Sequence, residues 1–161
     1  MLGYKNRIAR VNLTKGGKVT YEELPDEVIR KFVGGKGGLG YYIIYKEVPP
    51  GTDPLSPANR FVFAPPGGLT GLIPGSSKVI AVSKSPETGL ISDSSGGGDA
   101  FGPKLKGHFD ALVIEGRSEE PVYLYVHDGE VEIRGARPTS GGVREIPRWR
   151  ESSGGSTRRR A

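Results

Sequence analysis

The chain has 161 residues, including 26 Gly, 13 Pro and no Cys, a length typical of one domain with its own core. The lack of cysteine excludes disulfides, thiolate zinc sites, Cys-ligated iron–sulfur clusters and Cys nucleophiles, and two histidines, His108 and His127, are too few for a histidine-rich metal site. The net charge of +5 belongs to residues 135–161, where seven Arg face two Glu, so residues 1–134 are neutral and give no electrostatic indication of nucleic-acid binding.

Short strands and turns are expected in the first half of the chain. Residues 8–13 and 18–21 flank a Gly-Gly turn and predict a hairpin. A helix is predicted to open at Pro25-Asp26, where a missing N–H costs little and negative charge meets the helix dipole. Its apolar face comprises Val28, Ile29, Phe32 and Val33, and it ends at Gly34-Gly35. A second helix is predicted over residues 39–47, before Pro49-Pro50.

Strands dominate the second half. Apolar β-type segments at 60–64, 78–82 and 90–92 are separated by loops of Gly, Pro and Ser. Residues 110–115, an apolar run between charges, predict a strand buried on both faces. Residues 121–126 and 130–134 flank Asp128-Gly129 and predict a hairpin. The chain is therefore expected to be predominantly β, with few short helices.

Residues 135–161 differ from the rest in composition. They hold few apolar residues and show neither helical nor strand periodicity. Such a segment buries too little surface to offset its ordering entropy, so we predict a disordered Arg/Gly/Ser-rich tail. No apolar run approaches the ~18 residues of a membrane helix. The start, MLGYKNRIAR, lacks the apolar stretch of a signal peptide, so a soluble cytoplasmic protein is expected.

One glycine pattern resembles a dinucleotide fingerprint. Gly35, Gly37 and Gly40 satisfy GxGxxG. That fingerprint normally follows a strand, whose end aims the turn at a pyrophosphate, whereas here a helix is predicted to precede it. The Lys-Ser/Thr ending of a P-loop is also missing. We therefore interpret the segment as a helix–helix turn.

Two further Gly-rich stretches, residues 65–78 and 92–99, lie next to predicted strands. Small residues let backbone N–H groups approach an anion, and Ser hydroxyls and Lys78 supply further donors. These loops suit a large phosphate-bearing ligand, or are ordinary surface turns. No side chain is identified as a catalytic nucleophile or a metal ligand, because no nucleophile stands next to a base, and both histidines are expected at the surface.

The order of several unusual strings resembles one known family. RIARVNLTKG, FVGGKGGLGYYI, DPLSPANRFVFAPPGGLTG, PGSSKVIAVSKSPETGLISDSSGGGDAFGPKLK and GHFDALVIEGRSEEPVYLYV occur in that order. The chain resembles the N-terminal domain of the tungsten-containing aldehyde ferredoxin oxidoreductase family over roughly residues 3–134. The resemblance implies an α+β, predominantly β fold in which two related sheet layers form a base beneath the cofactor.

The resemblance also implies a cofactor and a reaction. In the family two molybdopterins hold tungsten, or molybdenum in some relatives, and a [4Fe-4S] cluster passes electrons from aldehyde oxidation to ferredoxin. Lys78 stands where the family has a basic residue, usually Arg, before the strand leading to KSP. The family's Asn/Ser-Gly-Gly stretch matches Ser94, Ser95, Gly96 and Gly97, or the same residues shifted by one. These five residues are the predicted cofactor-binding residues.

The match stops near Arg134, and the family's cluster ligands and substrate cavity lie in later domains. This chain is therefore expected to share the cofactor with other domains or a separate catalytic chain, to ligate no cluster, and not to oxidise aldehydes alone. We interpret residues 1–134 as an incomplete domain and 135–161 as a frameshifted tail. The alternatives are a genuine short pterin- or phosphate-binding or assembly subunit, which could form a homodimer, and a nucleic-acid-associated protein that uses the tail.

Overall fold

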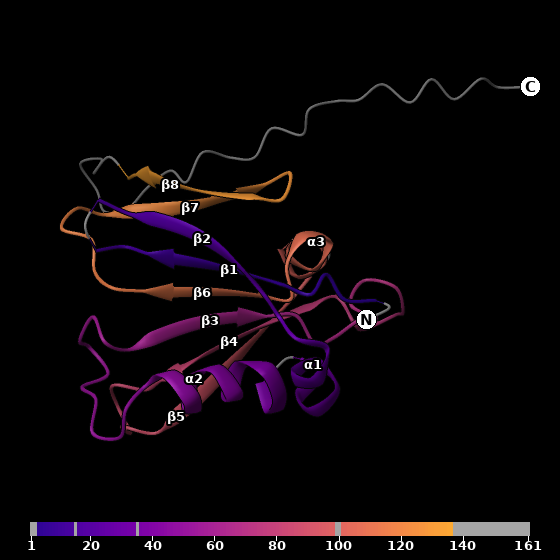
Figure 1. The fold of residues 1–161 in the computed structure, drawn as a ribbon, viewed down its shortest axis with the longest axis horizontal. Coiled ribbons are helices and arrows are strands. Elements are labelled where there is room, and N and C mark those ends of the chain that lie inside the picture. The colour runs from indigo at the N-terminus through magenta and orange to yellow at the C-terminus, as the bar shows by residue number, and fades with distance from the viewer. Residues whose placement is uncertain (1–2, 15, 35, 99–100, 137–161) are drawn as a thin grey trace, which may run out of the picture.

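A mixed six-stranded sheet organises the molecule (Figure 1). The computed structural model describes residues 3–14, 16–34, 36–98 and 101–136, with Lys36 and Gly37 as backbone only. The strand order is β2-β1-β6-β3-β4-β5, with β1 and β6 parallel and every other pair antiparallel. These strands are β1 (Arg7–Asn12), β2 (Lys18–Glu23), β3 (Arg60–Ala64), β4 (Lys78–Lys84), β5 (Ile91–Gly97) and β6 (Ala111–Glu115).

Two groups of elements cover the two faces of this sheet (Figure 1). One face carries α1 (Asp26–Phe32), the π-helical turn η1 (Lys36–Gly40) and α2 (Tyr41–Glu47). The other carries α3 (Phe101–His108) and the separate antiparallel hairpin of β7 (Val122–His127) and β8 (Glu130–Gly135). The predicted α+β, predominantly β fold with two sheets and short helices is confirmed.

Strand β6 has apolar side chains on both faces of the sheet, so both faces must be packed against other elements. Ala111 and Val113 belong to the core under α1 and α2, whereas Leu112 belongs to the core under α3 and the hairpin. All three are buried, and successive residues of a strand point to opposite faces. The prediction of a strand buried on both faces is confirmed.

Helix α1 ends one residue before Val33, which the sequence analysis had placed on the apolar face of the helix. Asp26 and Glu27 in the first turn and Arg30 and Lys31 in the last turn complement the helix dipole. Val33 follows the helix with φ of +57° and is 54% exposed, so its assignment to the apolar face was wrong. A β-branched residue rarely adopts positive φ, which is why the pattern gave no sign of it.

The GxGxxG segment connects α1 to α2, as predicted, although Gly35 lies outside the described residues. Gly38 has φ of −123° and ψ of −109°, and a Cβ there would lie 1.6 Å from the carbonyl oxygen of Phe32. The glycine therefore permits close packing of two helical segments, and the ring of Phe32 stacks on Tyr42 with centroids 4.3 Å apart.

The two flanking hairpins of the sequence analysis, β1–β2 and β7–β8, are confirmed. Two other elements differ from expectation. Helix α3 was not predicted, because Gly102, Pro103 and Gly107 hide its helical pattern. The Ser/Gly stretch after residue 92 was expected to be a loop, but it continues β5 to Gly97 through pairing with β4. Ser and Gly have little intrinsic preference for strands, so only the long-range pairing decides this.

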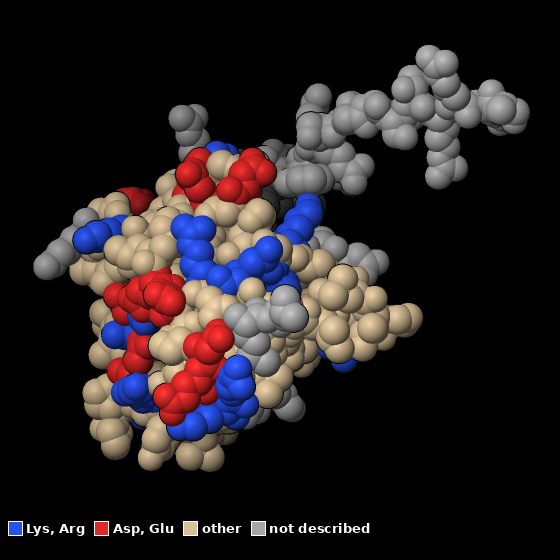
Figure 2. Space-filling view, turned by 45° about the vertical axis from the view of Figure 1, so that its right-hand side comes forward, with Lys and Arg blue, Asp and Glu red and all other residues tan. Residues whose placement is uncertain are grey.

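Basic and acidic side chains lie over the left and centre of the face shown in Figure 2, and the right-hand side of that face is largely uncharged. Basic and acidic side chains alternate there, and no field of one sign extends over that face. The predicted disordered, frameshifted tail lies outside the described residues. No helix among the described residues is long and apolar enough to cross a bilayer.

Gly102 provides a test of how α3 is seated. A Cβ at this position would lie 2.2 Å from the carbonyl oxygen of Lys78, which is backbone and does not rotate away. We expect Gly102→Ala to lower the free energy of unfolding by about 1–3 kcal/mol, measured by urea denaturation. The control is Gly107→Ala in the same helix, where nothing lies within 4 Å and stability should stay the same or rise. Equal effects of the two substitutions would contradict this seating.

Candidate functional site

The predicted site residues lie on one pair of strands, Lys78 on β4 and the other four on β5. Lys78 begins β4 and pairs with Gly97 near the end of β5. The ladder continues with Val79 opposite Gly96, Ile80 opposite Ser95 and Ala81 opposite Ser94. The pairing thereby brings Lys78 next to Gly97, with the other predicted residues further along the same ladder.

The pleat divides these residues between the two faces of the sheet. Directly opposed residues of an antiparallel pair point to the same face, and the period along each strand is two. Ile80 is buried under the helices α1 and α2, so Ser95, Lys78 and Gly97 share that face. Ser94 and Gly96 lie on the opposite face. The five residues therefore do not form one set.

Strand β5 is an edge of the sheet, and its hydrogen bonding shows which peptide groups point outward. Ser85 N–H donates to Leu90 O over 2.8 Å, and Gly98 N–H donates to Ser77 O over 3.1 Å. The alternation of an antiparallel ladder then directs the even-numbered residues of β5 toward β4. The peptide groups of Ser95 and Gly97 point away from it, toward the open edge.

A hydrogen bond on the helical side secures this edge strand. The Tyr41 hydroxyl at the start of α2 donates to Asp93 Oδ1 over 2.9 Å. This bond is the largest cause of the raised pKa of Tyr41, with burial and the negative charge of Asp93 adding to it. The strand is thus held to α2 two residues before Ser95.

A cavity of about 460 Å³ lies where β4 begins and β5 ends. Among the described residues that line it, Lys78 is the one with a charged side chain. A Cβ added at Gly97 or Gly98 would meet nothing within 4 Å, so the backbone there is open to a ligand. An ammonium group beside accessible peptide groups suits an anion. The described lining residues of this Lys78 pocket are Gly71, Leu72, Ile73, Pro74, Gly75, Ser77, Lys78, Gly97 and Gly98.

Residues 67–77, here called the glycine loop, form one wall of the Lys78 pocket and are held by two of their own hydroxyls. Thr70 Oγ1 donates to Gly67 O over 2.8 Å. Ser76 Oγ accepts the N–H of Gly71 at 3.0 Å and lies 2.7 Å from Ile73 O, to which it donates. The loop is therefore shaped by side-chain to backbone bonds within itself.

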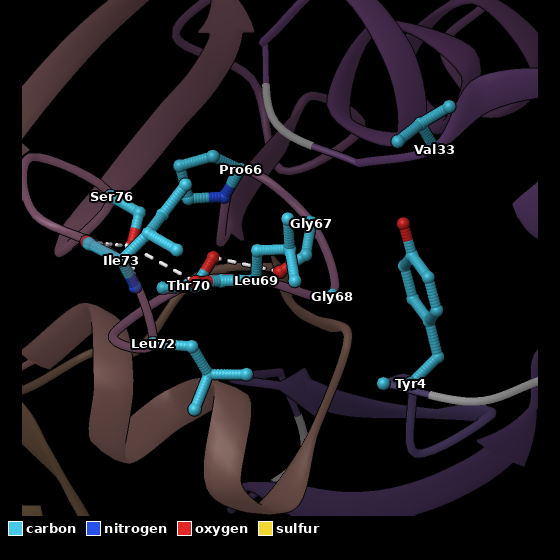
Figure 3. Close-up of a pocket in the computed structure, with 11 residues that line it drawn as sticks. Tyr4, Val33, Pro66, Gly67, Gly68, Leu69, Thr70, Leu72, Ile73 and Ser76 are labelled. Carbon is cyan, nitrogen blue, oxygen red and sulfur yellow. Dashed lines mark hydrogen bonds between the residues drawn. The ribbon is translucent and has the colours of Figure 1, made fainter.

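A second cavity, of about 580 Å³, lies on the other side of the glycine loop (Figure 3). Tyr4 stands opposite Gly67 and Gly68 with its hydroxyl directed toward Val33. No charged side chain lines this cavity among the described residues. Leu72 is 73% exposed at its rim and is shared with the Lys78 pocket. The two cavities are thus separated only by this loop.

Neither histidine lies in the Lys78 pocket. His127 Nε2 lies 2.8 Å from Glu132 Oε1 on the hairpin, and this bond raises the pKa of His127 against the opposing effect of desolvation. His108 packs against Phe109 with ring centroids 6.2 Å apart. Both side chains are half-buried rather than fully at the surface.

Within residues 3–14, 16–34, 36–98 and 101–136, no three His, Asp or Glu side chains gather in a way that could hold a metal ion.

Comparison with known proteins decides the family. The model of the aldehyde ferredoxin oxidoreductase N-terminal domain matches residues 8–157. This chain belongs to the aldehyde ferredoxin oxidoreductase family. The match to the aldehyde ferredoxin oxidoreductase N-terminal domain continues past Arg134 into residues that the structure does not describe.

Similar proteins agree with this assignment. The tungsten-containing aldehyde ferredoxin oxidoreductase of Pyrococcus abyssi is 44% identical over 138 residues, and the aliphatic sulfonate oxidoreductase WOR-like subunit of Pyrococcus furiosus is 39% identical over 140 residues. Each alignment covers 84% of this chain but 22% of the relative. The chain therefore spans about a fifth of the length of these aldehyde ferredoxin oxidoreductase relatives.

A solved structure shares the fold. The active site complex BamBC of benzoyl coenzyme A reductase with 1,5-dienoyl-CoA superposes with a TM-score of 0.76 and 32% identity. The superposition covers 84% of this chain and 20% of that one. The arrangement of sheet and helices is thus that of other aldehyde ferredoxin oxidoreductase N-terminal-like domains.

Sequence reasoning missed several residues that shape the site. Tyr4 carried no signal, because a lone aromatic residue near the start of a chain is not distinctive. Ser76 and Thr70 are small polar residues in a turn-rich stretch, where hydroxyl to backbone bonds are common. The one available signal was that two hydroxyl side chains, Thr70 and Ser76, occur within the same glycine-rich loop, where they can bond to its backbone.

The role of Ser76 in the glycine loop can be tested directly. Ser76→Ala leaves the N–H of Gly71 without its acceptor, and an unmade hydrogen bond costs about 1–3 kcal/mol. We expect the Gly71 amide to exchange with solvent about tenfold faster or more, measured by hydrogen–deuterium exchange. Ser77→Ala is the matched control, since the Ser77 hydroxyl makes no bond to the described part of this loop. Unchanged exchange at Gly71 would mean that the loop is held by other contacts.

Proposed function

We propose that this chain is the cofactor-cradling domain of a tungsten- or molybdenum-dependent aldehyde oxidoreductase, and that the Lys78 pocket holds a phosphate of the pterin cofactor. The observation that carries the proposal is the convergence of Lys78, the outward backbone of β5 and the glycine loop on one open cavity. Relatives of this chain are tungsten-containing enzymes by name. Their activity is proposed here for the protein to which this domain contributes.

The residues of the pocket fit an organic phosphate. The Lys78 ammonium supplies a positive charge, and Gly97, whose N–H group points to the open edge, lines the same pocket. Ser95 lies two residues earlier on the same face of β5, with its N–H group also directed outward. Charge-assisted hydrogen bonds of this kind are stronger than neutral ones. The open space at Gly97 and Gly98 lets a ligand reach the backbone, which a larger side chain would cover.

The pleat favours one of the two serines as a ligand. Ser95 shares a face with Lys78, whereas Ser94 points to the face of α3. We therefore propose Lys78, Ser95 and Gly97 as the cofactor-binding residues. Gly96 is left out, because it lies on the opposite face and its peptide groups are directed toward β4. Lysine offers a single charged point where an arginine offers a planar fork, so Lys78 contacts one phosphate oxygen at a time.

The bound metal–pterin group would supply the redox centre for conversion of an aldehyde to a carboxylate. This chain binds and orients one end of that group and shields it on the side of the sheet. The residues do not fit the [4Fe-4S] cluster, because the chain has no cysteine. Cluster ligands are therefore assigned to the remaining domains or a separate catalytic chain. We assign the route of electrons to ferredoxin and the substrate cavity to the same parts, and propose a homodimer as the alternative partner arrangement.

The phosphate site is tested with pyrophosphate as the probe. We expect the full chain to bind it, and Lys78→Ala to weaken binding about tenfold to a hundredfold, since a hydrogen bond to a charged group contributes about 1.5–3 kcal/mol. Lys78→Arg should retain binding. Ser95→Ala should weaken it while the matched control Ser94→Ala should not. Calorimetric titration gives the affinities. Absence of binding by the unaltered chain, or equal affinity of Lys78→Ala, would refute the site.

The assignment of catalysis to other parts of the enzyme has its own test. We expect no aldehyde-dependent reduction of benzyl viologen by the purified 161-residue chain supplied with molybdopterin and tungstate, because no cysteine is present to bind a cluster. The tungsten-containing aldehyde ferredoxin oxidoreductase of Pyrococcus furiosus serves as the positive control under the same conditions. Measurable dye reduction by the pure chain would overturn the assignment.

A further inference from the structure

Tyr4 is the contact between the N-terminal segment and the base of the glycine loop (Figure 3). A Cβ at Gly67 would lie 3.3 Å from the Tyr4 hydroxyl oxygen, and one at Gly68 would lie 3.1 Å from Tyr4 Cε2. The two glycines therefore place backbone directly against the phenol ring. The position of the Tyr4 ring therefore limits where Gly67 and Gly68, the first residues of the glycine loop and here called its base, can lie.

A buried ion pair lies beneath this ring. Lys106 Nζ is 4.3 Å from the centroid of the Tyr4 ring, a distance at which a cation is attracted to the ring face. The Lys106 side chain is 8% exposed and pairs with Asp110, which is 2% exposed. Both charged groups are withdrawn from water, so they have little freedom to leave this position.

The same carboxylate holds the backbone that carries Tyr4. Asp110 accepts the N–H of Lys5 at 3.0 Å and the N–H of Arg7 at 3.3 Å. The Asp110 N–H donates to Arg7 O over 2.8 Å. Asp110 thus fixes the main chain on the C-terminal side of Tyr4, while Lys106 fixes the ring.

The glycine loop transmits the position of its base to the Lys78 pocket. Its hydroxyl to backbone bonds tie Thr70 to Gly67 and Ser76 to Gly71. At the far end of the loop, Lys78 N–H donates to Ser76 O over 2.8 Å. A Cβ at Gly71 would lie 3.1 Å from Pro103, so α3 limits movement on that side. A displacement at Tyr4 therefore changes the wall that faces Lys78.

We propose that Tyr4, held by Lys106 and Asp110, is a positioning residue for the Lys78 pocket. It sets the place of the glycine loop relative to Lys78 and β5, and through that the affinity of the pocket for a phosphate-bearing ligand. This inference rests on the proposed function of the pocket.

The full chain is titrated with pyrophosphate and followed by amide NMR. We expect Tyr4→Leu to lower the affinity at least fivefold, because the ring that supports Gly67 and Gly68 is gone. Tyr4→Phe keeps the ring over Lys106 and should stay within twofold of the unaltered chain. Val131→Ala is the matched control: it opens the other core, under the hairpin, and should lower stability without changing affinity.

A ligand-free measurement separates this inference from the proposed function. Tyr4→Leu should shift the amide resonances of Gly71 and Lys78, and Val131→Ala should not. If Tyr4→Leu fails to fold, Gly68→Ala presses from the loop side on the Tyr4 ring and on the adjoining Gly3 backbone, and should shift the same two resonances. Unchanged resonances, or an equal loss of affinity in Val131→Ala, would overturn the positioning role. Lack of pyrophosphate binding by the unaltered chain, with those shifts present, would refute the proposed function and the effect on affinity while leaving the loop contact intact.

Discussion

The buried carboxylate of Asp110 joins the N-terminal segment to α3 and β6, and the arrangement of the sheet depends on this junction. It lies between α3 and β6 and binds Lys106 on one side and the backbone of the N-terminal segment on the other. A buried carboxylate is costly unless every oxygen is bonded, and here three N–H groups approach it. The consequence is that β1 leaves this point alongside β6 and in the same direction, which creates the one parallel pairing of the described sheet.

A second close approach ties this junction to the candidate site. Helix α3 begins with Gly102 against the backbone of Lys78, so the helix that leads to Asp110 also rests on the first residue of β4. Helix α3 therefore contacts the residue that begins β4, while Tyr4 contacts the base of the glycine loop at Gly67 and Gly68. On the opposite end of the sheet, Arg10 bonds Glu22 and Glu47 and joins β1 to β2 and α2, which keeps the helical layer in place.

Local patterns in the sequence were sufficient for the elements that are decided locally. The Asp128-Gly129 turn, the Gly-Gly turn before β2 and the apolar run of β6 were all predicted with their structures. The approximate position of the proposed phosphate-binding residues, Lys78 and its partners in β5, was also predicted from the sequence through the family resemblance.

The rest depends on contacts between distant residues. Ser94 and Ser95 are identical neighbouring residues, so the sequence does not distinguish them. Only the pairing with β4 assigns them to opposite faces of the sheet. Helix α3 has two glycines and a proline in eight residues, so its pattern argues against a helix until its packing on Lys78 is known. Tyr4 and Asp110 are more than a hundred residues apart and carry no shared pattern. Burial and long-range hydrogen bonding, rather than propensity, decide these features.

The pleat of β5 has a consequence for how this domain tolerates changes in length. One residue inserted between Asp93 and Ser95 would exchange the two faces of every later position, taking the hydroxyl of Ser95 from the Lys78 side to the α3 side. One residue inserted after Gly98, beyond the last bond to Ser77, would leave the ladder untouched. Length variation among related domains is therefore expected to concentrate in the short connection to α3, and to be absent from the strand itself.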